Sequence, residues 1–97
     1  MTWGNRQLTP EGVVKSGVKQ YLRIKGWFVF PIMQGALSYP GISDFIAIKE
    51  GKVLFVECKT KKGRQSERQK LFQVEIEHQQ GTYLIISDFE ELKALGY

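Results

Sequence analysis

Two acids and a lysine stand where the sequence predicts the end of a pair of buried strands. Glu57 and Lys59 close the largely apolar run "KVLFVECKT", and Asp44 opens the apolar run before it. Residues two apart in a strand point to the same side, so Glu57 and Lys59 share a face. A hairpin turn falls about midway between Asp44 and Glu57, which makes these two carboxylates cross-strand neighbours. The sequence therefore predicts two carboxylates and one ammonium at one end of a sheet.

Such a cluster suits metal-assisted hydrolysis of a phosphodiester. Adjacent carboxylates repel each other and lose hydration, and a divalent cation such as Mg²⁺ offsets both costs. The cation can polarise a phosphate and lower the pKa of a bound water. Lys59 could orient or deprotonate that water, or neutralise the charge that develops on the phosphate. The plainer alternative is a salt bridge from Lys59 to Glu57 or Asp44 that closes the sheet edge.

Basic residues follow this cluster directly. The chain carries a net charge of +4, and eight cations against three acids lie between positions 49 and 70. The four cations that come soonest after the cluster and open the next helix are Lys61, Lys62, Arg64 and Arg68. A nucleic-acid backbone approaching a metal at the cluster would pass them, so we expect them to bind DNA phosphates. A solvated loop and helix face is the alternative.

The elements that must position these residues alternate between helix and strand. The expected helices cover residues 9–25, 66–80 and 88–97, and the expected strands cover 27–33, 44–49, 52–60 and 82–87. Thr9, Ser66 and Asp88 are suited to cap the three helices. The second helix should bury Leu71, Val74 and Ile76. The strand over 52–60 is apolar on both sides, which predicts an α/β fold of order αβββαβα, with a small mixed sheet flanked by helices.

Length and composition limit the remaining choices. The 97 residues predict one domain over 1–97. Cys58 is the single cysteine, so an internal disulfide and a cysteine zinc site are both excluded. No apolar run is long enough to span a membrane and no signal-peptide pattern opens the chain, so we expect a cytoplasmic protein. Trp3, before the first helix, is a candidate dimer contact.

The motifs resemble those of a known nuclease family. "SD" at 43–44 with "ECK" at 57–59 resembles the PD-(D/E)xK motif of restriction-endonuclease-like nucleases, although Ser43 stands where that motif has proline. The segments "TPEGVVKSGVKQYLRIKG", "PGISDFIAI" and "KVLFVECKTKKGRQSERQKLF" narrow the resemblance to the virus-type replication-repair nuclease domain, VRR-NUC. Each motif is weak alone, but the order and spacing of the whole set are specific over nearly the whole chain.

The resemblance implies a role for each matching residue. Asp44, Glu57 and the backbone carbonyl of Cys58 would bind Mg²⁺ or Mn²⁺, with Glu11 of the first helix near or on the metal. Lys59 would be the catalytic lysine. Gln69 would reach the site from the second helix, and its alternative is to pair with Ser66 in a capping box.

The resemblance also implies a substrate and an assembly. Free-standing members of the family resemble Holliday-junction resolvases, so we expect a homodimer that cleaves branched DNA in a bacterial cell or a phage-infected host. Three alternatives stay open: a nuclease of another specificity (flap-cutting, nicking or restriction-type), a DNA-binding module without catalysis, and a scaffold in a larger complex.

Overall fold

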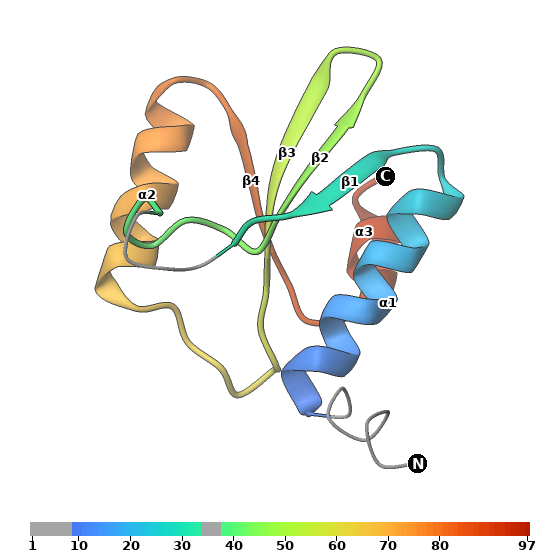
Figure 1. Cartoon of the computed structure of the whole chain (residues 1–97), viewed down its shortest axis with the longest axis horizontal. Coiled ribbons are helices and arrows are strands. Elements are labelled where there is room, and N and C mark those ends of the chain that lie inside the picture. The colour runs from blue at the N-terminus through green and yellow to red at the C-terminus, as the bar shows by residue number, and fades with distance from the viewer. Residues whose placement is uncertain (1–8, 34–37) are drawn as a thin grey trace.

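The computed structural model describes residues 9–33 and 38–97 and has the predicted order αβββαβα (Figure 1). The helices are α1 (Pro10–Ile24), α2 (Glu67–His78) and α3 (Phe89–Ala94). The strands are β1 (Phe28–Pro31), β2 (Phe45–Lys49), β3 (Lys52–Cys58) and β4 (Thr82–Ile86). The candidate dimer contact Trp3 lies outside the described residues. None of the described helices is long and apolar enough to cross a membrane.

Each helix begins at the predicted cap. The Thr9 hydroxyl accepts a hydrogen bond from the Gly12 amide at 3.0 Å, and Pro10 occupies the first helical position, where its missing N–H costs nothing. Ser66 forms a capping box at the start of α2, and Asp88 forms one at the start of α3. These caps satisfy amide groups that would otherwise lack partners, and so fix where the helices start.

The four strands form one mixed sheet in the order β1-β2-β3-β4. The β1–β2 and β2–β3 pairs are antiparallel, and the β3–β4 pair is parallel. Glu50 and Gly51 both have positive φ, 50° and 82°, which is typical of the tight turn that joins β2 to β3. Two of the predicted strands extend two residues too far, because β1 ends at Pro31 and β3 at Cys58, and the other strand ends agree with the prediction to within one residue.

Helices cover the sheet on both faces, as predicted for a strand that is apolar on both sides. Helices α1 and α3 lie on one face and α2 lies on the other (Figure 1). The main core forms under α1 and α3, where Leu54 and Val56 of β3 meet Val18 and Leu22 of α1, all four fully buried. Burying each such side chain contributes about 1.5–3 kcal/mol.

The predicted apolar side of α2 is wrong. Leu71 and Val74 are 65% and 58% exposed, and the buried residue of this helix is Phe72. The Phe72 ring packs against the rings of Phe55 and Tyr83, with centroids 5.8 and 6.0 Å away. Because an aromatic ring buries more area than either aliphatic side chain, Phe72 sets the rotation of the helix. Of the three predicted residues, only Ile76, one turn after Phe72, is half-buried.

Candidate active site at the end of strands β2 and β3

Asp44 is held by its backbone between two strands. Its amide donates to the Val56 carbonyl at 3.1 Å, and its carbonyl accepts from the Ile32 amide at 2.9 Å. The β2–β3 register ends at the Phe45–Val56 pair, one residue short of both Asp44 and Glu57. Direct pairing of the two carboxylates across the strands therefore stays a prediction. One carboxylate oxygen of Asp44, Oδ2, accepts a hydrogen bond from the Cys58 amide at 2.8 Å.

Glu57 is a fully buried carboxylate near the end of β3, which is one of the two inner strands of the sheet. Its Oε1 accepts a short hydrogen bond from the hydroxyl of Tyr83, on the neighbouring strand β4. Among the described residues no donor forms a hydrogen bond to Oε2. A buried oxygen of this kind costs free energy unless a cation or a donor meets it. A positive charge near Oε2 would therefore stabilise Glu57.

Lys59 supplies a positive charge close to Oε2. Its Nζ lies 3.4 Å from Glu57 Oε2, as an ion pair without the alignment of a hydrogen bond. The Lys59 side chain is 18% exposed, so it lies at the boundary between the sheet and solvent. Its backbone amide donates to the Ile86 carbonyl at 3.0 Å, which continues the β3–β4 contact one residue past β3. The predicted pairing of Glu57 with Lys59 is present.

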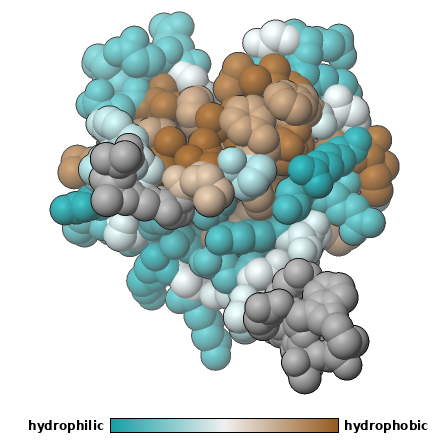
Figure 2. Space-filling view, in the orientation of Figure 1, coloured by the Kyte–Doolittle hydropathy of each residue, from teal (hydrophilic) through white to brown (hydrophobic). Residues whose placement is uncertain are grey.

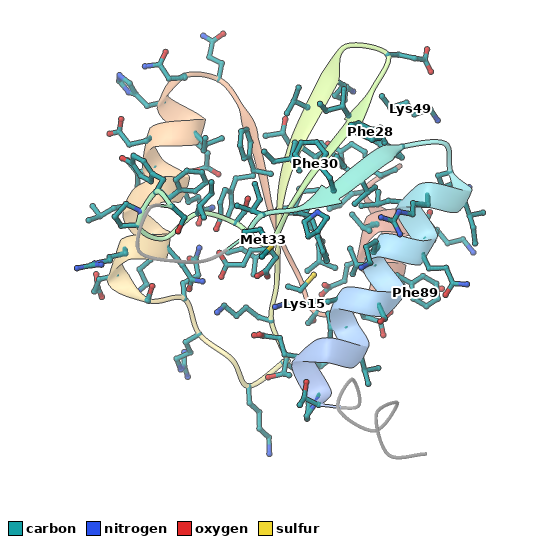
Figure 3. The ribbon with its side chains drawn as sticks, in the orientation of Figure 1. Lys15, Phe28, Phe30, Met33, Lys49 and Phe89 are labelled. Carbon is teal, nitrogen blue, oxygen red and sulfur yellow. The ribbon has the colours of Figure 1, made fainter. Side chains whose placement is uncertain are left out.

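A second lysine, Lys15 of α1, lies against Asp44. Its Nζ is 3.5 Å from Asp44 Oδ1 and 3.6 Å from Glu11 Oε2. Figure 3 labels Lys15 among the side chains of the chain. Burial alone would lower the pKa of Lys15, but the carboxylates of Asp44 and Glu11 outweigh burial and raise it. Lys15 is therefore cationic at neutral pH and links Glu11 to the site.

The structure thus gathers Asp44, Glu57 and Lys59 at one end of the sheet, with Glu11 joined to them through Lys15. Within the described residues, no three Asp, Glu, His or Cys side chains form a group that could hold a metal. Direct ligation of a metal by Glu11 accordingly stays a prediction.

Gln69 takes the capping role that was its alternative. Its Oε1 accepts from the Ser66 amide at 2.8 Å, while its own amide donates to the Ser66 hydroxyl at 3.2 Å. The first turn of α2 nevertheless lies against the segment that leads to Asp44. A Cβ on Gly41 would overlap the Arg68 carbonyl group. The predicted contact of Gln69 with Lys59 or a phosphate stays a prediction.

The predicted phosphate-binding residues are exposed and follow the site along the chain. Lys61, Lys62 and Arg64 are exposed in the segment that joins β3 to α2, and Arg68 is exposed in the first turn of α2. All four follow Lys59 within ten positions along the chain. Their exposure leaves their charges free to meet an anionic partner.

The Cys58 side chain is part of the core. Its thiol is buried between the sheet and α1. Burial first, and the nearby Asp44 carboxylate second, raise the pKa of this thiol to about 12. Cys58 is therefore a neutral apolar side chain, and any role at the site would belong to its backbone.

The oxygen atoms at this site suit a hard divalent cation. Magnesium in proteins uses one or two carboxylates and keeps several waters, so Asp44 and Glu57 form a sufficient protein contribution. In each carboxylate one oxygen is held by a hydrogen bond and the other faces an ammonium group. The buried Oε2 of Glu57, without a hydrogen bond, is the strongest single sign that a cation fits here.

Comparison with known proteins supports the fold. A scan against protein-family models finds no match, and a search of curated proteins finds none either. A solved structure described as "VRR_NUC domain" superposes on this chain with a TM-score of 0.78 at 20% sequence identity, over 90% of this chain and 94% of that one. The chain therefore has the fold of a VRR_NUC domain, and the resemblance predicted from the motifs is confirmed at the level of the fold.

Two residues at the site were missed by the sequence analysis. Lys15 follows Glu11 by four positions, the spacing of a helical ion pair, and that signal was available. Tyr83 lies opposite Phe55 in the parallel β3–β4 pair, so its hydroxyl reaches Glu57. Nothing local in the sequence fixes the register of a parallel pair, although a buried tyrosine hydroxyl usually requires a partner.

Proposed function

We propose that this chain is a Mg²⁺- or Mn²⁺-dependent endonuclease that hydrolyses phosphodiester bonds in branched DNA, such as Holliday junctions, as a homodimer. One observation carries the proposal: Asp44 is hydrogen-bonded to the end of β3 that carries the buried Glu57, and Lys59 pairs with the Glu57 oxygen that has no hydrogen bond. The likeness to a structure described as a VRR_NUC domain favours a nuclease over other uses of this constellation. Branched DNA and the dimer rest on the motif resemblance.

The roles of the residues follow from their surroundings. Asp44 and Glu57 would hold the cation, with the Cys58 carbonyl as a third oxygen. When bound, the cation supplies Lewis-acid polarisation of the scissile phosphate and a water of lowered pKa. Tyr83 and the Cys58 amide each hold one carboxylate oxygen, and so keep the other oxygen directed for binding.

Lys59 is the group that touches the reacting atoms. A lysine at the boundary between sheet and solvent can direct its ammonium to an attacking water or to a phosphate oxygen. Glu57 holds Lys59 by the ion pair at 3.4 Å, so the position of the ammonium is linked to the carboxylate that would bind the cation. Loss of either residue would therefore disturb both functions.

The exposed cations Lys61, Lys62, Arg64 and Arg68 would bind the phosphates that flank the cut. Contacts of these exposed side chains with phosphates would position the DNA and would carry no direct sequence information. Selection among DNA substrates would accordingly depend on shape, which a branched duplex offers and a plain duplex lacks.

A single cleavage assay tests the proposal. The purified protein would be incubated with labelled four-way junction, flap, linear duplex or single strand, in Mg²⁺, in Mn²⁺ or in EDTA. We expect metal-dependent, paired, symmetric nicks in the four-way junction. Cleavage of flaps or plain duplex instead would retain the nuclease and discard the junction specificity.

The controls separate chemistry from binding. Asp44→Ala, Glu57→Ala and Lys59→Ala should each abolish cleavage and leave DNA binding largely in place, which a mobility-shift assay would report. Cleavage that survives all three changes would overturn the proposed site. Binding without cleavage under any metal would favour the DNA-binding module, and absence of DNA affinity at low salt would favour the scaffold.

A further inference from the structure

The two carboxylates of the site have matching surroundings. Each has one oxygen fastened by a hydrogen bond, Asp44 Oδ2 by the Cys58 amide and Glu57 Oε1 by the Tyr83 hydroxyl. The other oxygen of each carboxylate faces an ammonium group. Asp44 Oδ1 lies 3.5 Å from Lys15 Nζ, and Glu57 Oε2 lies 3.4 Å from Lys59 Nζ. The two oxygens left for a cation are therefore the two that lysines now face.

Lys15 is placed for this contact by α1. It lies one helical turn after Glu11, in the orientation that favours an acid–base pair on a helix, so Glu11 supports it from the N-terminal side. The Asp44 side chain is 18% exposed and the Lys15 side chain 38%, so the contact between them is partly shielded from water. A charge pair in that setting interacts more strongly than a fully solvated pair.

The Lys15 contact is also easy to give up. At 3.5 and 3.6 Å its Nζ is beyond the optimal range for a charge-assisted hydrogen bond to either carboxylate. Its four-carbon side chain can rotate and carry the ammonium into solvent. Asp44, in contrast, is fixed by three hydrogen bonds through its amide, its carbonyl and Oδ2, so it would stay in place when Lys15 leaves.

We propose that Lys15 is the resident counter-ion of the metal-free site: a positioning residue that compensates Asp44 and Glu11 and that a divalent cation displaces from Asp44 Oδ1. The displacement rests on the proposed function, because it needs a cation at Asp44 and Glu57. The compensation does not, because it concerns only the three side chains in contact. Lys15 would thus oppose the binding of a metal, and it compensates the charge of the carboxylates until a metal binds.

Cation binding measured directly, without substrate, tests the displacement. Titration of Mn²⁺ followed by electron paramagnetic resonance would compare the wild type with Lys15→Met, Lys15→Arg and Lys19→Met. Lys19 is the matched control: it lies one turn further along α1, its Nζ is 5.8 Å from the centroid of the Phe45 ring, and within the described residues it makes no ion pair. We expect Lys15→Met to bind Mn²⁺ about tenfold more tightly than Lys19→Met, since the competing charge is gone. Lys15→Arg should retain the wild-type affinity.

Melting in EDTA tests the compensation. Lys15→Met should melt at a lower temperature than Lys19→Met, and the added change Asp44→Asn should restore most of the loss. Equal or weaker Mn²⁺ binding by Lys15→Met than by Lys19→Met would overturn the displacement. Failure of every variant, and of the wild type, to bind Mn²⁺ would overturn the nuclease proposal and the displacement together, and the melting comparison would still decide the counter-ion role.

Discussion

At the scale of single residues, Glu57 stands out because it is the one charged side chain that is buried among the described residues. A fully buried carboxylate is tolerated because Tyr83 donates to one oxygen and Lys59 pairs with the other. Removing one partner of such a buried group leaves it uncompensated, which usually costs more than the partner itself contributed. The surroundings of Glu57 therefore make separate predictions for stability and for catalysis.

The first prediction concerns Tyr83. Tyr83→Phe keeps the ring that packs on Phe72 and removes only the hydroxyl, so Glu57 Oε1 loses its donor. We expect unfolding in urea to become easier by about 1–3 kcal/mol, and cleavage to fall because Glu57 is no longer held in one orientation. Tyr39→Phe is the control, because Tyr39 also packs on Phe72 but is 58% exposed. Equal stability of the two variants would contradict the assigned role of the hydroxyl.

The second prediction concerns the pH dependence that Cys58 imposes. Burial and Asp44 raise the pKa of the folded thiol from 9.0 to about 12, so ionisation favours the unfolded chain. The stability due to the neutral thiol is complete below pH 9.0 and is lost as pH rises through the interval up to about 12. Urea unfolding at a series of pH values should show a shallower decline above pH 9.0 for Cys58→Ala than for the wild type. Parallel curves would contradict the buried-thiol assignment.

At the scale of elements, the segment 38–44 carries Asp44 and is fixed against the first turn of α2. Gly41 has φ of +77°, and a Cβ at this position would overlap the Arg68 carbonyl oxygen, so a side chain has no room. The same turn contains Gln69 and is closed by Ser66. The position of Asp44 therefore depends on an element that lies on the other side of the sheet from α1.

This arrangement predicts that Gly41→Ala is strongly destabilising. Its control is Gly51→Ala, because Gly51 has a similar φ of +82° but open space around it. We expect Gly51→Ala to cost about 1–2 kcal/mol from backbone strain alone. Gly41→Ala should cost clearly more in the same urea unfolding experiment, because a Cβ that overlaps the Arg68 backbone must push the segment away from α2. Equal costs would mean that the segment is not anchored there.

The elements also show which features a sequence can predict. The caps at Thr9, Ser66 and Asp88 are local signals, and all three helices begin where those residues predict. The hairpin likewise indicates that Asp44 lies beside the end of β3, where its carboxylate accepts from the Cys58 amide, because one turn fixes an antiparallel register. The rotation of α2 and the Tyr83 contact were not predictable in this way, since both depend on how distant elements pack.

At the scale of the whole molecule, charge is distributed unevenly around the site. The basic segment that follows β3 gives the predicted DNA surface its charge, and the fourth prediction is a change in salt dependence. Replacing Lys61, Lys62 and Arg64 together by Gln should weaken binding to every DNA tested. Each cation that no longer neutralises a phosphate lowers the slope of log affinity against log salt by about 0.9, so the slope should fall by up to about 2.7. The matched change of Lys25, Lys49 and Lys52 to Gln, at the opposite end of the sheet, should leave the slope nearly unchanged.

The molecule also exposes an apolar sheet face that its own helices leave open. The β1–β2 and β2–β3 registers align six apolar side chains on the α2 side of the sheet: Phe28, Phe30, Ile46, Ile48, Val53 and Phe55. All six are half-buried or exposed, with Phe28 at 66%, and Figure 2 shows hydrophobic residues gathered in the upper middle of this view. Patches of this kind mark interaction sites.

The second copy of the chain in the proposed homodimer would fit against this apolar face. Interfaces between identical subunits are more apolar than other interfaces, and a face without charge can meet itself across a two-fold axis without repulsion. The chain carries a net charge of +4, so two copies would approach less readily through the basic surface. Glu57 projects from β3 two residues beyond Phe55 on this same face, so a dimer formed here would bring the two sites toward one another.

The last prediction is therefore that Phe28→Glu converts a dimer into a monomer. Phe28 is exposed and stands on the edge strand of the sheet, so the change should spare the fold and introduce a negative charge into the apolar face of each copy. Sedimentation velocity should show a dimer for the wild type and a monomer for Phe28→Glu. Ile24→Glu is the control and should remain dimeric, because Ile24 is an even more exposed apolar residue and lies on α1, away from this face. If the monomeric variant still nicks one strand of a four-way junction, paired cutting depends on the dimer and single-strand cleavage does not. A wild type that sediments as a monomer would remove the dimer from the proposal. The chemistry proposed for Asp44, Glu57 and Lys59 would be unaffected.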